Sequence, residues 1–410
     1  MVVPRSAPVA DARSSREATG ARRSAWWGIA LVVAVFAGAQ GPYLWRNLPK
    51  HHWEDFRHFR HNRDQVHSLR DCFVKPSAWA GAEATYRPLS ANLYYFVGRT
   101  LFANRPQAYH LLDAATYLLN GVLLLLLARE LLPDLPALVG PVLFVSRSAH
   151  EQDIAYTSNF DTLSYAALCL LGLLLFVRGR RRERRAGEVA AVAAFAIALL
   201  CKEAAIVWPA LVTLYGWIFD RASAWRKYVA GWLVAGAWAL AYPRIIHALY
   251  PAEQPRFAFD FHPAGLLGRY AAYLFTFLNH LVPRIDPEGA GWAMPPEVAR
   301  LAATATAIAL AAVLVAVTAA LVLLARLRPA ALGEPGRVIA FGLGWFVVAT
   351  APFLVFADRL FMRYGYLGHA GIAIAIGGML AAVEERWRMR HGRDVESALG
   401  APPRAASATS

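Results

Sequence analysis

The sequence predicts an all-α, polytopic integral membrane protein. Hydrophobic residues make up 57% of the 410 residues, and the mean hydropathy of +0.36 is too high for an ordinary soluble enzyme. Several runs approach the roughly 20 apolar residues that cross the hydrocarbon core of a bilayer. Such runs form helices, because every backbone polar group inside lipid needs an internal hydrogen bond. We therefore expect a bundle of about ten transmembrane helices.

The charge pattern supports a membrane protein and argues against nucleic-acid binding. The formal net charge is +14, and arginine supplies most of it. The basic residues lie in short runs between apolar segments and in the two tails, as the positive-inside rule requires of cytoplasmic segments. Cys72, Cys169 and Cys201 form no disulfide or metal-binding pattern. We predict neither a bound metal nor a cofactor.

The apolar runs define the expected topology. The first run has no small-residue cleavage site, so we expect a retained span and not a signal peptide. Residues 178–185 hold the strongest basic cluster and mark a cytoplasmic loop. The expected spans are residues 26–45, 108–132, 135–147, 161–177, 188–200, 204–219, 228–247, 299–325, 338–356 and 367–383.

Both termini are then cytoplasmic. We expect residues 1–25 to be a disordered cytoplasmic tail, 26–385 to be the transmembrane domain and 386–410 to be a second cytoplasmic tail. Residues 264–282 either span the membrane or lie in its interface. We prefer the second, because it keeps the later basic segments inside.

The first loop, residues 46–107, is long and extracytoplasmic in this topology. Residues 88–99 are apolar but too short and too interrupted to span, so we expect an interfacial helix there. Near the start of the loop, Glu54 and Asp55 form a carboxylate pair at the membrane surface that could act as a general base. The alternative is that these acids are merely solvated.

Ionisable residues from several separate loops share the outer side of this topology. They are Glu54, Asp55, His150, Glu151, Asp153, Asp161, Lys202, Glu203, Asp358 and Arg363. For Lys202 and Glu203, two interpretations stay open. They form a local ion pair, or Lys202 offers a cation to a lipid phosphate.

A polar stripe runs along the second expected span. His110, Asp113, Tyr117 and Asn120 are spaced by three, four and three residues and share one helix face. An acid inside a span costs roughly 2.5–3.5 kcal/mol on insertion scales, so we expect the stripe to face the interior of the bundle. It serves either as polar contacts between helices or as a wall of the site.

Four blocks in order resemble the GT-C superfamily of membrane glycosyltransferases. They resemble the transmembrane, tetratricopeptide-repeat-containing O-mannosyltransferases, here without the repeats, and more distantly the protein O-mannosyltransferases. The matching blocks are Arg87-Pro88-Leu89 with Tyr109-His110-Leu111, the segment from His150 to Leu163, Leu199-Leu200-Cys201-Lys202-Glu203, and Gly342-Leu343-Gly344-Trp345-Phe346 with Arg363-Tyr364-Gly365-Tyr366.

The resemblance implies a GT-C fold and a definite reaction. Such enzymes transfer a sugar such as mannose from a polyprenyl-phosphate carrier to a protein, glycan or lipid acceptor on the extracytoplasmic face, with inversion. Asp55 or Glu54 is then the base. Arg363, Lys202 and Arg87 are the candidates for the lipid phosphate. The candidates for the sugar or acceptor pocket are His110, Asp113, His150, Asp161, Glu203 and Tyr364.

The sequence departs from the family pattern at four places. The first-loop pair is Glu54-Asp55 where the family has paired aspartates. The family's second-loop glutamate falls on Gln152, its arginine before Phe-Asp falls on Asn159, and its acid before Arg-Tyr falls on Met362.

Two other functions stay open. A transporter or flippase for a lipid-linked sugar predicts repeated halves and ionisable groups near the membrane midplane. A non-catalytic scaffold of the same fold predicts that Glu54 and Asp55 point to bulk water, with no groove open to lipid.

Overall fold

The fold was analysed in a computed structural model. It describes residues 10–49, 53–77, 85–103, 105–147, 151–220, 226–250, 259–278, 304–356 and 361–398. Within these ranges the chain is helical and contains no strand, apart from an isolated bridge between Phe259 and Phe356. The prediction of an all-α, polytopic membrane protein is confirmed.

Within the described ranges, seven helices are long and apolar enough to cross a membrane. They belong to α1 (Ala10–Asn47), α5 (Pro106–Leu131), α8 (Phe160–Arg181), α11 (Arg226–Leu249), α14 (Ala305–Leu327), α15 (Pro329–Leu354) and α16 (Tyr366–Ala398). The other expected spans fall on the shorter helices α6 (Asp134–Val145), α9 (Arg185–Cys201) and α10 (Trp208–Phe219). Each expected span thus corresponds to a helix, although these last three are shorter than a typical span.

The terminal helices extend further than the sequence predicts. Helix α1 begins at Ala10, so the prediction of disorder is wrong for residues 10–25, and residues 1–9 lie outside the described part. Alanine, arginine and glutamate in this segment favour helix, and an existing span spares them the cost of nucleation. Helix α16 continues through the predicted second tail as far as Ala398.

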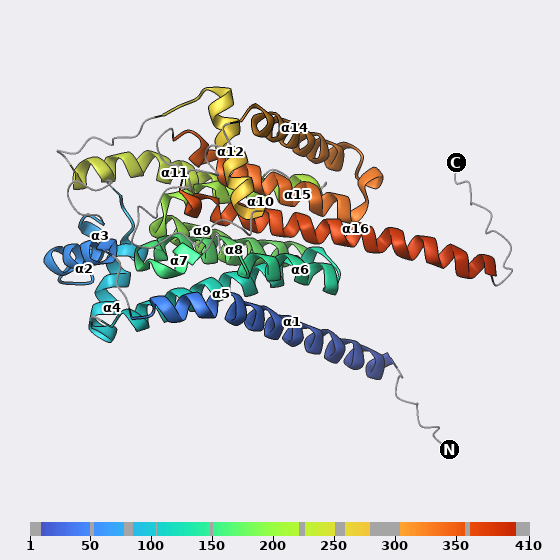
Figure 1. Cartoon of the computed structure of the whole chain (residues 1–410), viewed down its shortest axis with the longest axis horizontal. Helices are drawn as coiled ribbons and strands as arrows, with labels where there is room; N and C mark the ends of the chain where they lie inside the picture. The colour runs from blue at the N-terminus through green and yellow to red at the C-terminus, as the bar shows by residue number, and fades with distance from the viewer. Residues whose placement is uncertain are drawn as a thin grey trace, which may run out of the picture.

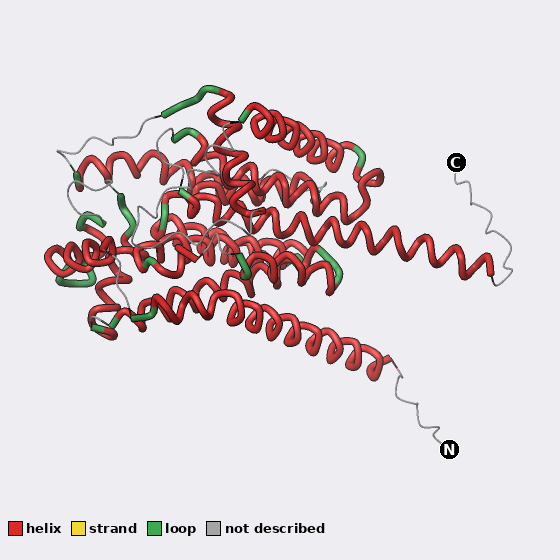
Figure 2. Tube along the Cα trace, viewed as in Figure 1, coloured by secondary structure: helices red, strands yellow, loops and turns green. Residues whose placement is uncertain are grey.

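The long helices run in one common direction, and the first-loop helices gather at one end of them (Figure 1). These are α2 (Trp53–Gln65), α3 (Asp71–Val74) and α4 (Tyr94–Phe102). The beginning of α1 and the end of α16 both lie at the opposite end (Figure 2). This placement agrees with the prediction that both termini lie on one side of the membrane.

Helix α12 (Pro263–Leu278) crosses the direction of the long helices (Figure 1). It covers most of residues 264–282, the segment with two possible placements. Because α12 lies across the long helices and not along them, its orientation argues against the spanning placement. Residues 279–282 lie outside the described part.

The first-loop segment 88–99 is helical, as expected. It forms a π-helical turn, η1 (Pro88–Leu93), followed by α4. Several of its side chains are buried, and Ser90 Oγ donates a hydrogen bond of 2.5 Å to the carbonyl of Cys201 at the end of α9. The segment therefore packs onto the bundle where α9 ends.

Helices α15 and α16 approach closely because glycines face each other. A Cβ atom on Gly342 would lie 2.5 Å from the carbonyl oxygen of Gly371, and one on Gly371 would lie 2.6 Å from that of Gly342. Small residues of this kind let membrane helices pack backbone to backbone. Gly342 belongs to one of the family-like blocks, so that block has a packing role in this chain.

Candidate functional site

The site is built around Asp161, in the first turn of α8. Its carboxylate accepts from two cations of distant segments. Arg87 Nη1 lies 2.5 Å from Asp161 Oδ2, and Lys202 Nζ lies 3.2 Å from Asp161 Oδ1. The Asp161 side chain is 7% exposed, so these contacts are shielded from water. A carboxylate at a helix N-terminus is also favoured by the helix dipole.

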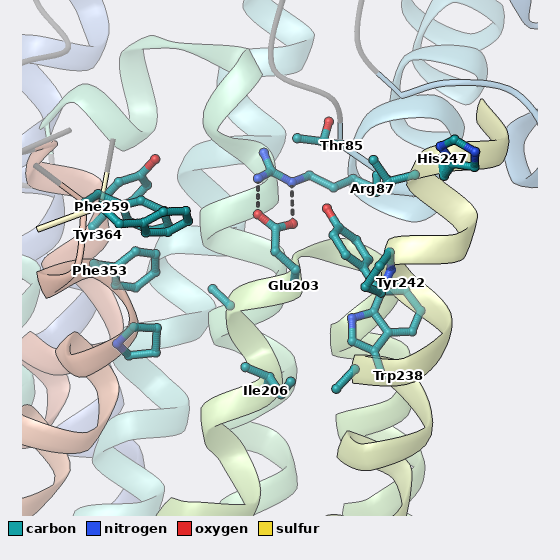
Figure 3. Close-up of a pocket in the computed structure, with 16 residues that line it drawn as sticks. Thr85, Arg87, Glu203, Ile206, Trp238, Tyr242, His247, Phe259, Phe353 and Tyr364 are labelled. Carbon is teal, nitrogen blue, oxygen red and sulfur yellow. Dashed lines mark hydrogen bonds and ion pairs between the residues drawn. The ribbon is translucent and has the colours of Figure 1, made fainter. Parts of the chain in front are cut away.

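Arg87, directly before η1, binds a second carboxylate. Its Nε donates to Glu203 Oε2 at 3.0 Å, and its Nη2 donates to Glu203 Oε1 at 2.5 Å, which makes a bidentate pair (Figure 3). Burial disfavours the charge, but Glu203 and Asp161 outweigh it and hold the pKa of Arg87 well above its usual value. A guanidinium carries more N–H groups than the three engaged here.

Lys202 and Glu203 each pair with a distant residue. Lys202 is 2% exposed and donates to Thr162 Oγ1 at 2.6 Å as well as to Asp161. Burial lowers the pKa of Lys202 to about 8, against the opposing effect of Asp161. The expected alternative of a local ion pair between Lys202 and Glu203 is not what the structure shows, because Glu203 is bound by Arg87.

Arg363 approaches the same region from η5 (Met362–Gly365). Its Nη1 donates to Asn159 Oδ1 at 3.5 Å, and its guanidinium carbon lies 4.5 Å from the centre of the Phe361 ring. The neighbouring Tyr364 stacks on Phe353 of α15 with ring centres 4.4 Å apart. The Arg363-Tyr364 block thus contacts Asn159 through Arg363 and Phe353 through Tyr364.

Asp55 binds the segment just before α8. It lies on α2 with 0% of its surface exposed, and its Oδ1 accepts from the backbone N–H of Ser158 at 3.0 Å. The scaffold hypothesis predicts a solvent-facing Asp55 and is wrong on that point. The side chain of Glu54 lies outside the described part.

His58 follows Asp55 by three residues on α2. Burial lowers the pKa of His58 to about 4, with a smaller opposing effect from Asp161 and smaller lowering effects from Arg87 and Arg363. Its ring stacks on Tyr95 with centres 5.5 Å apart. The face of α2 that carries His58 therefore lies within electrostatic range of Asp161, Arg87 and Arg363.

The polar stripe on α5 faces the interior, as predicted. His110, Asp113, Tyr117 and Asn120 are all 0% exposed. Asp113 Oδ1 accepts from Tyr94 Oη at 2.8 Å, and His110 Nδ1 lies 3.1 Å from the carbonyl oxygen of Ile154. These contacts join α5 to α4 and to α7 (Glu151–Ala155), which favours the interpretation of polar contacts between helices.

His150, another predicted pocket residue, lies outside the described part. Two buried charged residues, Asp153 and Arg147, are not among the predicted pocket residues. Asp153 on α7 is 1% exposed, and burial raises its pKa to about 7 although Lys202 and Arg363 oppose this. Arg147 is 6% exposed, and its Nε and Nη1 find no hydrogen-bond partner within the described ranges. In the sequence, the signal for Arg147 and Asp153 is a charged residue beside a short apolar run.

A groove of about 520 Å³ opens beside the Arg87–Glu203 pair. One wall is the face of α11 that carries Trp238, Tyr242 and Ile246, four residues apart. The opposite wall holds Phe353 and Tyr364, and Arg87 and Glu203 lie between the walls (Figure 3). The groove is apolar except for this ion pair, Thr85, His247 and two tyrosines; Asp55 is not among its lining residues.

Among the residues that the structure describes, no group of three or more His, Cys, Asp or Glu side chains is arranged to hold a metal ion.

The helical bundle is similar in fold to an archaeal oligosaccharyltransferase. A solved structure of the oligosaccharyltransferase from Archaeoglobus fulgidus, tethered to an acceptor peptide, matches 93% of this chain with a TM-score of 0.50 and 13% identity. Its apo form matches 93% with a TM-score of 0.49 and 13% identity. The chain spans about half of those proteins, 52% and 53% of their lengths, so the likeness concerns the fold alone. No protein-family model and no curated protein matches the sequence.

Proposed function

We propose that this protein is an inverting glycosyltransferase that moves a sugar from a polyprenyl-phosphate carrier to an acceptor on the extracytoplasmic side. The observation that carries the proposal is the apolar groove that ends at the guanidinium of Arg87. A carrier of this class has an isoprenoid chain and a phosphate, and the groove offers one surface for each.

The donor would lie with its chain between α11 and α15. Trp238, Ile246 and Phe353 supply apolar contact area. Arg87 then meets the phosphate, because a guanidinium suits the geometry of phosphate oxygens and retains N–H groups beyond those bound to Asp161 and Glu203. Trp238 Nε1 is buried without a hydrogen-bond partner in the described part, and so offers a further donor.

The other two cations take different roles. Lys202 is almost fully buried against Asp161 and Thr162, so we assign it to positioning Asp161, and through it Arg87. Arg363, beside Tyr364 at the groove, is the second candidate to stabilise charge on the leaving phosphate. We assign Tyr364, which lines the groove, to the sugar.

The reaction then follows from general base catalysis. The Asp55 carboxylate takes the proton of the acceptor hydroxyl as its oxygen attacks the anomeric carbon. The bond from that carbon to the phosphate oxygen breaks, and the polyprenyl phosphate departs with the electron pair. Attack opposite the leaving group inverts the anomeric centre.

Mannose is suggested by the resemblance of the four sequence blocks, and His110, Asp113 and His150 stay predictions for the pocket. The oligosaccharyltransferase with a similar fold was solved with an acceptor peptide, so a peptide is the first class of acceptor to test.

The position of the charges favours an enzyme over a transporter. Asp161, Lys202 and Arg363 lie at the start of α8, after the end of α9 and just before α16, at helix ends. A transporter of the usual kind places such groups near the midplane, on interrupted helices.

A blocked groove tests the proposal. Ala239 lines the groove on α11, whereas Ala237 is exposed and does not. In membranes, Ala239→Trp should abolish sugar release from polyprenyl-phosphate mannose and related donors, and Ala237→Trp should preserve it. Equal activity of the two variants, at equal protein levels, would overturn the assignment of the groove.

A further inference from the structure

A second cavity lies at the other end of the bundle, between α9, α10 and α11. Its volume is about 660 Å³. Along α9 it is lined by Val189, Val192, Ala193 and Ala196, which share one helix face. Trp208 and Pro209 of α10 and the start of α11 complete its apolar walls. We call this space the α9 cavity.

The α9 cavity is polar at one end only. Arg185 and Glu188, in the first turns of α9, line that end, and the walls beyond them are apolar. From residue 185 to residue 196 the helix rises by about 16 Å. This is about half of the roughly 30 Å hydrocarbon core, which is the depth of one lipid leaflet.

The polar end carries a surplus of positive charge. Arg178 and Arg180 are neutralised by Glu130 and Glu188. Three exposed arginines of the same turn make no ion pair within the described part of the chain. These are Arg182, Arg184 and Arg185.

A buried hydroxyl adds a second observation. Tyr228 lines the α9 cavity, and its hydroxyl oxygen is buried against Gly216 without a hydrogen-bond partner among the described residues. A buried polar group of this kind is costly unless something binds it. Because protein encloses this oxygen, a ligand in the cavity would bind it only after the Tyr228 side chain turns toward the cavity.

We propose that the α9 cavity binds one anionic phospholipid of the adjacent leaflet, with an acyl chain along α9 and the phosphate at Arg184 and Arg185. Basic pockets between membrane helices on the cytoplasmic side suit such headgroups. A second copy of this chain fits less well, because a two-fold contact here would bring like charges together. This inference does not depend on the proposed reaction.

Lipid retention by the purified full-length protein tests the proposal. The protein is equilibrated with mixed micelles of phosphatidylglycerol and phosphatidylcholine in equal amounts, and bound lipid is counted by native mass spectrometry. We expect one retained phosphatidylglycerol. Arg184→Gln combined with Arg185→Gln should lower its affinity by about fivefold per arginine. The control is Arg386→Gln with Arg390→Gln, an equal charge change at exposed positions of α16.

A filled cavity provides the second arm. Ala193→Trp should eliminate the retained lipid, whereas Val313→Trp, at an exposed position of α14, should not. Three results would overturn the proposal. They are equal retention of phosphatidylcholine by the wild type, unchanged retention in Ala193→Trp, and a wild-type dimer that only Ala193→Trp dissociates, which would assign the cavity to a second copy.

Discussion

Arg87 and Asp161 form a shielded ion pair in which Nη1 of the arginine lies 2.5 Å from Oδ2 of the aspartate. The pair joins the end of the first loop to the start of α8. It also holds the guanidinium at the mouth of the apolar groove, where Glu203 binds its other edge (Figure 3). The proposed donor site therefore depends on a contact between segments that are far apart in sequence.

Removal of Arg87 should destabilise the fold. Arg87→Met leaves Asp161 and Glu203 without their cation, and breaking a buried pair in this way costs about 3–5 kcal/mol. Arg147→Met is the matched control, because it removes a buried guanidinium whose Nε and Nη1 have no hydrogen-bond partner in the described part, although it lies over the Phe277 ring. We expect a much lower Tm in detergent for the first variant only. Equal losses would contradict the central place given to Arg87.

The contact between α15 and α16 should not tolerate a methyl group. Gly342→Ala places Cβ 2.5 Å from the carbonyl oxygen of Gly371, and overpacking typically costs about 1–3 kcal/mol. Gly236 of α11 has open space around its Cβ position, so Gly236→Ala should gain about 0.5–1 kcal/mol from helix propensity. Thermal unfolding of both variants measures the difference, and the same sign of change in both would refute the packing argument.

Asp153 should make stability depend on pH. Its pKa is about 7 in the folded protein, chiefly through burial and against the opposing effects of Lys202 and Arg363. An unfolded aspartate loses its proton near pH 4. Between these values the folded state binds more protons, so the Asp153 contribution to stability falls as pH rises from about 4 to 7.

A difference between variants isolates this effect. The Tm of wild type and of Asp153→Asn is measured from pH 4 to pH 8. As pH rises, the Tm of Asp153→Asn should increase relative to that of the wild type. His58 acts in the opposite sense, because its pKa is lowered to about 4 and its contribution grows with pH up to its usual value near 6.5. A pH-independent gap for Asp153→Asn would show that this carboxyl titrates normally.

Much of the fold follows from patterns local in sequence. Apolar runs predict the helices, and the spacing of His110, Asp113, Tyr117 and Asn120 predicts their burial. The pairing of charges was not predictable in the same way. Arg87 reaches Asp161 across 74 residues and Glu203 across 116, whereas the adjacent Lys202 and Glu203 suggested a local pair.

The groove wall on α11 could not be predicted from the sequence for a related reason. Trp238, Tyr242 and Ile246 read as ordinary residues of a lipid-exposed span, and only the approach of α15 and Tyr364 makes their face part of a cavity. Helix length was also underestimated at both termini. A helix that is already nucleated by a packed span extends into polar sequence that would be disordered by itself.

The most direct test is sugar transfer by Asp55→Asn. Asparagine keeps the shape of the side chain and can still accept from Ser158 N–H, but it cannot take a proton at neutral pH. With polyprenyl-phosphate sugar donors and equal protein levels, we predict that transfer falls by more than about a hundredfold. Loss in Glu54→Gln alone would move the base by one residue. Full activity in both variants would contradict a first-loop base and with it the proposed transferase.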